Sequence, residues 1–158
     1  MLKVLIADDE EKICQLIIKL INWEEMGLKI AATASNGIEA LEQAKICKPE
    51  ILITDIRMPG IDGMELIRKV KEKLPDTEII IISGYRHFEY AQTAIRYGVR
   101  NYLLKPIKKE ELRDTLQKIA DIYREKNEQL NFEERVRLAL KNDAGKLRTS
   151  FISRMIYG

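Results

Sequence analysis

Histidine and cysteine, the residues that most often bind transition metals, are scarce in this sequence. There is one histidine, His87, and there are two cysteines, Cys14 and Cys47. The cysteines lie within predicted helices without the spacing of metal ligands, so we expect reduced, mostly buried thiols in a reducing compartment. We expect His87 to be a surface residue with no catalytic or metal-binding role. These shortages argue against a site built on cysteine or histidine.

Long hydrophobic segments are absent as well. No apolar run approaches the ~20 residues that a membrane-spanning helix needs. The N-terminus, Met1 to Ala7, runs directly into acidic residues and lacks the apolar core and cleavage site of a signal peptide. We therefore expect a cytoplasmic protein that has no membrane partner.

Neither part of the chain carries a marked excess of one charge. Residues 1–124 contain 20 lysines and arginines and 20 aspartates and glutamates, and residues 125–158 contain 7 and 5. Surfaces that bind nucleic acids concentrate basic residues, and neither segment does so. Of the 158 residues, 46% are hydrophobic and 33% are charged. That composition is typical of a globular domain.

Short apolar runs alternate with helical patterns along residues 1–124. Strands are predicted at residues 2–7, 28–33, 51–54, 79–82 and 99–104. Helices are predicted at residues 11–22, 37–47, 64–73, 88–97 and 108–124. Most of the strands are continuous β-branched runs, as expected for strands buried on both faces of a parallel sheet. We therefore predict an α/β fold, a flavodoxin-like, doubly wound five-stranded parallel sheet in the order 2-1-3-4-5.

Residues 125–158 have a different pattern and are predicted to form a helical linker or the start of a following region. The polar stretch 125–129 fits a linker or an exposed helix, 131–142 fits a short amphipathic helix, and 147–157 fits the start of another. The apolar spacing also allows the fifth helix to continue as a coiled-coil seam, although Lys126 interrupts it.

Acidic residues follow the first and third predicted strands. Asp8 and Asp9 end the first, and Asp55 ends the third. These strands flank the point where the strand order reverses, which is where doubly wound sheets place ligand sites. Any one of the aspartates could simply cap a helix or lie in a loop. Together they repel unless a cation compensates, and Mg²⁺ prefers such oxygen ligands. A carboxylate can also attack phosphorus to give an aspartyl phosphate.

The fourth and fifth strands end in groups that suit a phosphoryl site. Ser83, followed by Gly84, can donate a hydroxyl hydrogen bond, and Lys105 supplies a positive charge. Pro106 cannot extend the strand and could form a cis bond with Lys105. Alone, Ser-Gly is more often a turn and Lys-Pro more often contains a solvated lysine. Four such strand ends at one edge of the sheet favour a site that neutralises charge on phosphoryl oxygens.

Four segments together resemble the receiver domain of two-component response regulators: LIADDE, TDIRMPGIDG, IIISGY and YLLKPI, in this order and spacing over about residues 1–124. The resemblance implies the flavodoxin-like fold and makes Asp55 the phosphoacceptor. It implies that Asp9 and Asp55 bind Mg²⁺ directly, with Asp8 in the acidic pocket, commonly through water. The backbone carbonyl of Arg57 is then a further ligand.

The resemblance also assigns roles around the phosphoryl group. Lys105 pairs with it, Ser83 donates a hydrogen bond to one of its oxygens, and Tyr102 is the aromatic switch residue. Arg57 and Tyr85 flank the site and influence how long the phosphoryl group survives. The donor is a phosphohistidine on a sensor histidine kinase. Such a domain is not an enzyme in the usual sense, since it catalyses only its own phosphorylation and dephosphorylation.

Longer stretches are similar to the receivers of large bacterial regulators that end in an AraC-type helix-turn-helix domain. These are IRMPGIDGMELI, SGYRHFEYAQTAIRYGVRNYLLKPI and, in the tail, RTSFISRMIYG. This similarity implies a longer transcription regulator. Separately, we expect phosphorylation to change the surface of the fourth helix, fifth strand and fifth helix and to produce a homodimer. No helix-turn-helix pair is present, so DNA binding is expected only through a domain that is not in this chain.

Two other functions stay open at this point. Some hydrolases of a related layered fold also use an aspartyl nucleophile with Mg²⁺, but they place a second aspartate two residues after it. Arg57 occupies that position here, which argues against turnover of phosphate esters. The other alternative is a constitutive interaction module of receiver fold that phosphorylation does not control.

Overall fold

The computed structural model of the chain describes residues 1–84 and 88–142. The strands are β1 (Leu2–Ala7), β2 (Leu28–Ala34), β3 (Ile51–Thr54), β4 (Glu78–Ser83) and β5 (Asn101–Leu104). The helices are α1 (Glu11–Leu20), a short 3-10 helix η1 (Glu24–Met26), α2 (Gly37–Cys47), α3 (Gly63–Lys73), α4 (Phe88–Arg96) and α5 (Lys109–Asn142). The five β-α units therefore match the prediction, with small shifts of most ends, a longer fifth helix and the addition of η1.

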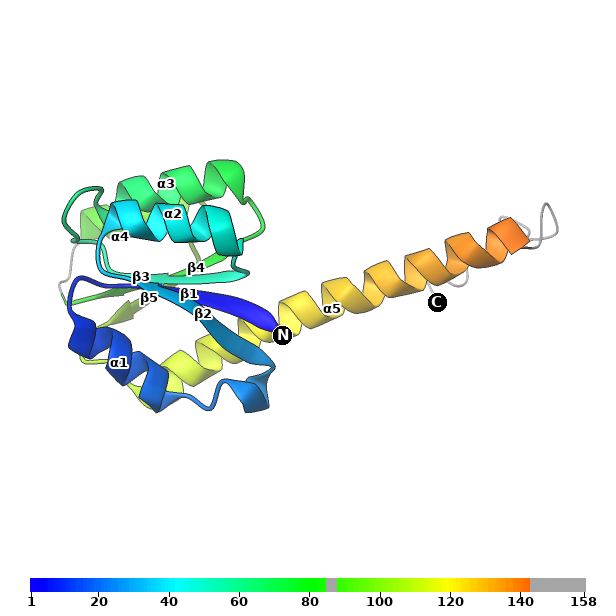
Figure 1. The fold of residues 1–158 in the computed structure, drawn as a ribbon, viewed down its shortest axis with the longest axis horizontal. Coiled ribbons are helices and arrows are strands. Elements are labelled where there is room, and N and C mark those ends of the chain that lie inside the picture. Colours follow the sequence, from blue (N-terminus) through cyan, green and yellow to red (C-terminus); the bar gives the residue numbers. More distant parts are fainter. Residues whose placement is uncertain (85–87, 143–158) are drawn as a thin grey trace. The chain divides into compact units, whose positions relative to one another are not determined.

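All neighbouring strands pair in parallel, in the order β2-β1-β3-β4-β5. Helices α2, α3 and α4 cover one face of the sheet, and α1 and the first turns of α5 cover the other (Figure 1). The predicted flavodoxin-like, doubly wound fold is confirmed. In this topology the carboxyl ends of β1 and β3 lie side by side at the reversal point.

The strands at the centre of the sheet are buried on both faces. Each residue of Ile79–Ile82 is at most 1% exposed, as are Ile51, Leu52 and Ile53 in β3. Covering helices on both faces leave no solvent-facing side, which explains why these strands lack apolar/polar alternation. The buried centre gives the carboxyl ends of the strands a rigid base.

Two side-chain caps fix the helices that flank the β3–α3 loop. The side chain of Asn36 accepts a hydrogen bond from the Glu39 N–H (2.8 Å) at the start of α2. Asp62 accepts one from the Glu65 N–H (2.9 Å) at the start of α3. Such caps satisfy N–H groups that have no partner within the helix.

Glycines at both helix starts let the β3–α3 loop pack backbone to backbone. The Gly63 N–H donates to the Ile56 carbonyl (2.6 Å), and a Cβ at Gly63 would overlap the carbonyl oxygen of Asp55. A Cβ at Gly37 would overlap the carbonyl oxygen of Ile61. The loop is therefore held from both sides by contacts that only glycine permits.

Helix α5 continues unbroken beyond residue 124 to Asn142, so residues 125–142 form a helix and not an irregular linker. Its first turns bury Leu112 and Leu116. The chain divides into two compact units, Met1–Ala120 and Asp121–Gly158. The division into a receiver at 1–124 and a linker region at 125–158 stays a prediction.

Both cysteines are unpaired, Cys14 buried and Cys47 half-buried. His87, Tyr85 and the predicted helix at 147–157 lie outside the described residues. Among the helices of the described part, none combines the length and hydropathy needed to cross a membrane.

Candidate functional site

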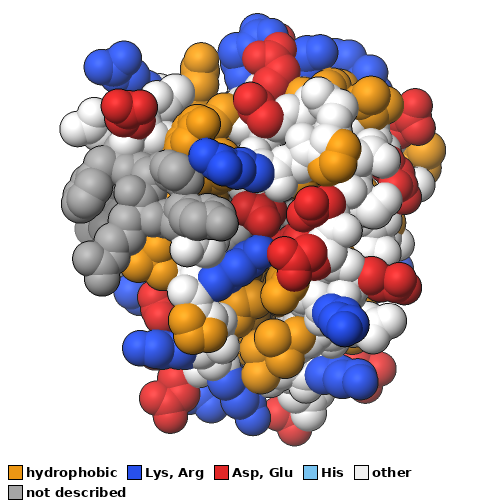
Figure 2. Space-filling view, turned by 90° about the vertical axis from the view of Figure 1, so that its left-hand side faces the viewer, with side chains coloured by type: hydrophobic (Ala, Val, Ile, Leu, Met, Phe, Trp, Pro, Cys, Tyr) orange, Lys and Arg blue, Asp and Glu red, His pale blue; other side chains and the backbone are white. Residues whose placement is uncertain are grey.

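The strand ends bring the predicted site residues to one edge of the sheet. The Asp55 N–H donates to the Ala7 carbonyl (3.0 Å), and the Lys105 N–H donates to the Ser83 carbonyl (2.8 Å), so the ladders continue one residue past β3 and β5. Seen from this edge, acidic and basic side chains lie together near the middle of the face (Figure 2). The predicted convergence of four strand ends is therefore present.

Three carboxylates form a cluster at this edge. Asp8, Asp9 and Asp55 each offer an oxygen, and these oxygens lie within 4.8 Å of one another. Asp8 is 3% exposed, Asp55 has 12% of its side chain exposed, and Asp9 is exposed. Carboxylate oxygens at this separation suit a hard dication such as Mg²⁺.

Lys105 bridges two of the three carboxylates. Its Nζ lies 3.0 Å from Asp55 Oδ2 and 3.2 Å from Asp8 Oδ2. The peptide bond between Lys105 and Pro106 is cis. The ammonium group offsets part of the negative charge that gathers where β1 and β3 end.

Backbone N–H groups hold the remaining oxygens of the same carboxylates. The Glu10 N–H donates to Asp8 Oδ1 (2.9 Å), and the Ile56 N–H donates to Asp55 Oδ1 (2.6 Å). Each carboxylate thus has one oxygen fixed by the backbone and the other turned toward Lys105. Asp55 is oriented before any ligand binds.

Burial and charge shift two pKa values in the cluster. Burial raises the pKa of Asp8, and the nearby Asp55 charge adds to this, although the Glu10 N–H and Lys105 work in the opposite direction. Burial alone would lower the pKa of Lys105, but its hydrogen bond and charge interaction with Asp55, together with Asp8, raise it. Lys105 is therefore charged at neutral pH, and ionised Asp8 carries an energetic cost.

The Asp8→Asn variant should be more stable than the wild type at pH 7 in chelator-containing buffer, by about 1 kcal/mol. The folded state raises the pKa of Asp8, so protonation of Asp8 stabilises the folded protein. This stabilisation is fully present below the unfolded-state pKa and is lost as the pH rises through the folded-state pKa. The gain should therefore shrink as the pH is lowered toward 4. Urea unfolding at both pH values measures it.

The matched control for this prediction is Asp9→Asn, because Asp9 is an exposed carboxylate of the same cluster. Its stability should change less than that of Asp8→Asn. A loss of stability in Asp8→Asn at pH 7 would mean that its attraction to Lys105 exceeds the cost of burial.

Ser83 and Tyr102 lie on the same face of the sheet. Ser83 pairs with Leu104 in β5, two residues after Tyr102, and side chains two residues apart in a strand point to one face. Ser83 is 2% exposed, and Tyr102 is partly buried against the core cluster beneath α2, α3 and α4. Their predicted roles as hydroxyl donor and switch residue stay predictions.

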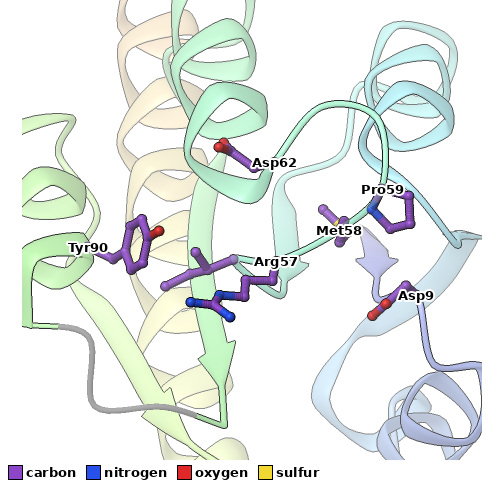
Figure 3. Close-up of a pocket in the computed structure, with 7 residues that line it drawn as sticks. Asp9, Arg57, Met58, Pro59, Asp62 and Tyr90 are labelled. Atoms are coloured by element: carbon purple, nitrogen blue, oxygen red, sulfur yellow. The ribbon is translucent and has the colours of Figure 1, made fainter.

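A pocket of about 370 Å³ borders the carboxylate cluster. Its lining comes from the ends of β1 and β3, the β3–α3 loop and α4 (Figure 3): Asp9, Ile56, Arg57, Met58, Pro59, Asp62 and Tyr90. Sequence reasoning had singled out Asp9 and Arg57 but not Asp62 or Tyr90. Tyr90 comes from a helix far along the chain, and no local pattern distinguishes it from a core aromatic residue.

Residues 4–117 match the family model of the response regulator receiver domain. The chain belongs to the response regulator receiver family. The receiver is 41% identical to the structure of the REC domain of AraT, a response regulator from Geobacillus stearothermophilus, over 80% of this chain and 98% of that one, with a TM-score of 0.76. It is 36% identical to a two-component transcriptional regulator AraC from Clostridium phytofermentans, over 77% of this chain and 94% of that one, with a TM-score of 0.72.

Among curated proteins, the receiver is similar to transcriptional regulatory proteins. It is 40% identical to the uncharacterised transcriptional regulatory protein YesN of Bacillus subtilis over 139 residues. The matched region covers 84% of this chain and 38% of YesN. It is 40% identical to the transcriptional regulatory protein HptR of Staphylococcus aureus over 107 residues. The matched region covers 68% of this chain and 42% of HptR. The chain therefore spans less than half the length of these relatives. The resemblance to the receiver family is confirmed.

Proposed function

We propose that this receiver accepts a phosphoryl group on Asp55 from a phosphohistidine of a sensor histidine kinase. The observation that carries the proposal is the position of Asp55. Its Oδ2 faces the Lys105 ammonium at 3.0 Å, and its Oδ1 is fixed by the Ile56 N–H. A carboxylate held in this way is preoriented for attack on phosphorus, and a cation beside it can neutralise the phosphoryl oxygens.

The acidic cluster fits Mg²⁺ by its chemistry, since it offers carboxylate oxygens and no sulfur or nitrogen ligands. Asp9 and Asp55 are the proposed direct ligands, with the Arg57 carbonyl, and Asp8 acts through water. When bound, Mg²⁺ supplies positive charge that orients and neutralises phosphoryl oxygens. Neither the cation nor Lys105 alone balances three carboxylates and a phosphoryl group.

In the proposed reaction, one Asp55 oxygen attacks phosphorus while the phosphorus–nitrogen bond to the kinase imidazole breaks. The imidazole keeps the electron pair of that bond, and Asp55 becomes an acyl phosphate. The Lys105 ammonium pairs with the transferred group and the Ser83 hydroxyl donates to one of its oxygens. Arg57 occupies the position where the related hydrolases have an acidic residue. We therefore propose that the domain catalyses its own phosphorylation and the slow loss of its phosphoryl group, and not the turnover of other phosphate esters.

The experiment that tests the proposal is intact-mass measurement after incubation with acetyl phosphate. One phosphoryl adduct is expected with Mg²⁺ and none with excess chelator. A folded wild-type sample that gains no adduct with Mg²⁺ would contradict the proposal and favour the constitutive interaction module.

The proposed output is homodimerisation. A phosphoryl group adds charge and acceptor oxygens beside Ser83, and movement of Ser83 opens space on the sheet face that it shares with Tyr102. Inward movement of Tyr102 changes the surface of α4, β5 and α5. Phosphorylation shifts this equilibrium by its differential stabilisation of the two states, on the order of 1–3 kcal/mol.

We assign the dimer contact to α4, β5 and their connection because three large side chains are exposed there: Ile95, Tyr97 and Leu104. The Ile95→Asp variant should weaken the phosphorylated dimer by about tenfold or more, because a buried isoleucine contributes about 1.5–3 kcal/mol. Analytical ultracentrifugation of adduct-bearing protein measures the change. The control is Ile46→Asp, at a 76% exposed position on α2; an equal effect there would exclude the α4–β5 surface.

For the whole protein, we propose a cytoplasmic transcription regulator of the AraC type. This proposal is supported by the similarity to YesN and HptR, transcriptional regulatory proteins of which the chain spans less than half, and to the two-component transcriptional regulator AraC. DNA contact is assigned to a domain that is not in this chain, with residues 1–124 as the receiver and residues 125–158 as the connecting region. Net charge near neutrality in both segments agrees with that assignment.

A further inference from the structure

The pocket beside the carboxylate cluster shares one residue with the cluster and contacts it through a second. Asp9 belongs to the cluster and also lines the pocket. Ile56 lines the pocket, and its N–H holds Asp55 Oδ1 at 2.6 Å. A molecule that enters this pocket therefore contacts Ile56, whose N–H holds the carboxylate of the proposed phosphoacceptor.

Tyr90 forms the α4 wall of this pocket. Among the described residues that line it, Tyr90 is the one contributed by α4, and the others come from the β1 and β3 ends and the β3–α3 loop. Figure 3 shows its ring across from the β3–α3 loop, with Arg57 between Tyr90 and Asp9. The ring is also partly buried against the core cluster, so it is a fixed wall.

We propose that Tyr90 controls the access of water and small phosphodonors to Asp55, and so sets the lifetime of the phosphoryl group together with Arg57. This inference rests on the proposed phosphorylation of Asp55. In hydrolysis, a water oxygen attacks phosphorus, the bond from phosphorus to the Asp55 oxygen breaks, and Asp55 keeps the electron pair. The phosphate leaves with the water oxygen, and the proton passes to phosphate or solvent. A large ring at the pocket wall limits how water reaches phosphorus.

A purely structural role for Tyr90 predicts different behaviour. Loss of packing would loosen the core, and any comparable truncation in that core would act similarly. Loss of a wall residue opens the pocket instead, so both phosphorylation by small donors and hydrolysis become faster.

The test uses the purified chain and follows intact mass after acetyl phosphate is removed by desalting. We expect the phosphoryl group of Tyr90→Ala to be lost about five times faster than that of the wild type. Its phosphorylation should also be faster, and Tyr90→Phe should keep the wild-type lifetime. The control is Val99→Ala, which trims the same core cluster at a residue that does not line the pocket.

The outcomes separate this inference from the function on which it rests. An adduct that forms in all variants, with Tyr90→Ala as long-lived as the wild type, overturns the role of Tyr90 alone. Equal shortening in Val99→Ala also overturns it, because packing then explains the effect. Absence of an adduct in the wild type overturns the proposed function itself.

Discussion

The Asp55→Asn variant is expected to gain no phosphoryl adduct under conditions that fully modify the wild type. The amide cannot supply the anionic oxygen that attacks phosphorus, and neither Asp8 nor Asp9 replaces it. Asp8 is buried with its oxygens facing Lys105 and the Glu10 N–H, and exposed Asp9 lacks the Lys105 contact that Asp55 has. Intact mass in the presence of Mg²⁺ measures the loss, and the same sample should not dimerise on treatment with donor.

Asp62→Asn is the matched control for this variant. Asp62 is an exposed aspartate that lines the neighbouring pocket, and asparagine caps a helix as well as aspartate does. This control should be phosphorylated like the wild type. An adduct on Asp55→Asn at wild-type level would place the phosphoacceptor elsewhere in the cluster and remove the basis of the proposed function.

The Gly63→Ala variant is expected to lose about 3 kcal/mol of unfolding free energy. Its Cβ would overlap the Asp55 carbonyl oxygen and lie 2.6 Å from the Ile56 Cα. Both are backbone atoms, so the conflict cannot be relieved by a side-chain rotation. The start of α3 must move away from β3, which also weakens the bond from the Gly63 N–H to the Ile56 carbonyl. Urea unfolding measures the effect.

Gly84→Ala is the control for the Gly63 substitution. The nearest atom to a Cβ there is Lys105 Cδ at 3.8 Å, an ordinary van der Waals distance. Its unfolding free energy should change by no more than about 0.5 kcal/mol. A similarly small change in Gly63→Ala would show that α3 can shift freely and that the loop is not held by this contact.

The sequence allowed the convergence of Asp8, Asp55 and Lys105 to be predicted because strand order alone decides it. Once three apolar runs are recognised as parallel strands, the residues after them must lie at one edge of the sheet. The same reasoning placed Ser83 there. These inferences need no knowledge of side-chain conformation.

The contacts around that edge could not be predicted in the same way. The choice of Asp8 over Asp9 as the second partner of Lys105 depends on which side chain turns inward, and adjacent aspartates look alike in sequence. The place of Tyr90 in the pocket depends on how α4 packs. The length of α5 was ambiguous because a polar sequence such as 125–129 fits both a linker and an exposed helix.

The contacts of Gly37 and Gly63 also make one side of the site, the β3–α3 loop, stiffer than the rest. Close backbone packing makes the β3–α3 loop stiff, since stretching or compressing such contacts is costly. A stiff support does not absorb the strain that a new charged group creates. In the proposed switch, the strain from a phosphoryl group on Asp55 is then transmitted mainly to β4 and β5, where Ser83 and Tyr102 share a sheet face. The same proposal makes the β3–α3 loop the fixed support, while the surface of α4, β5 and α5 is the part that moves.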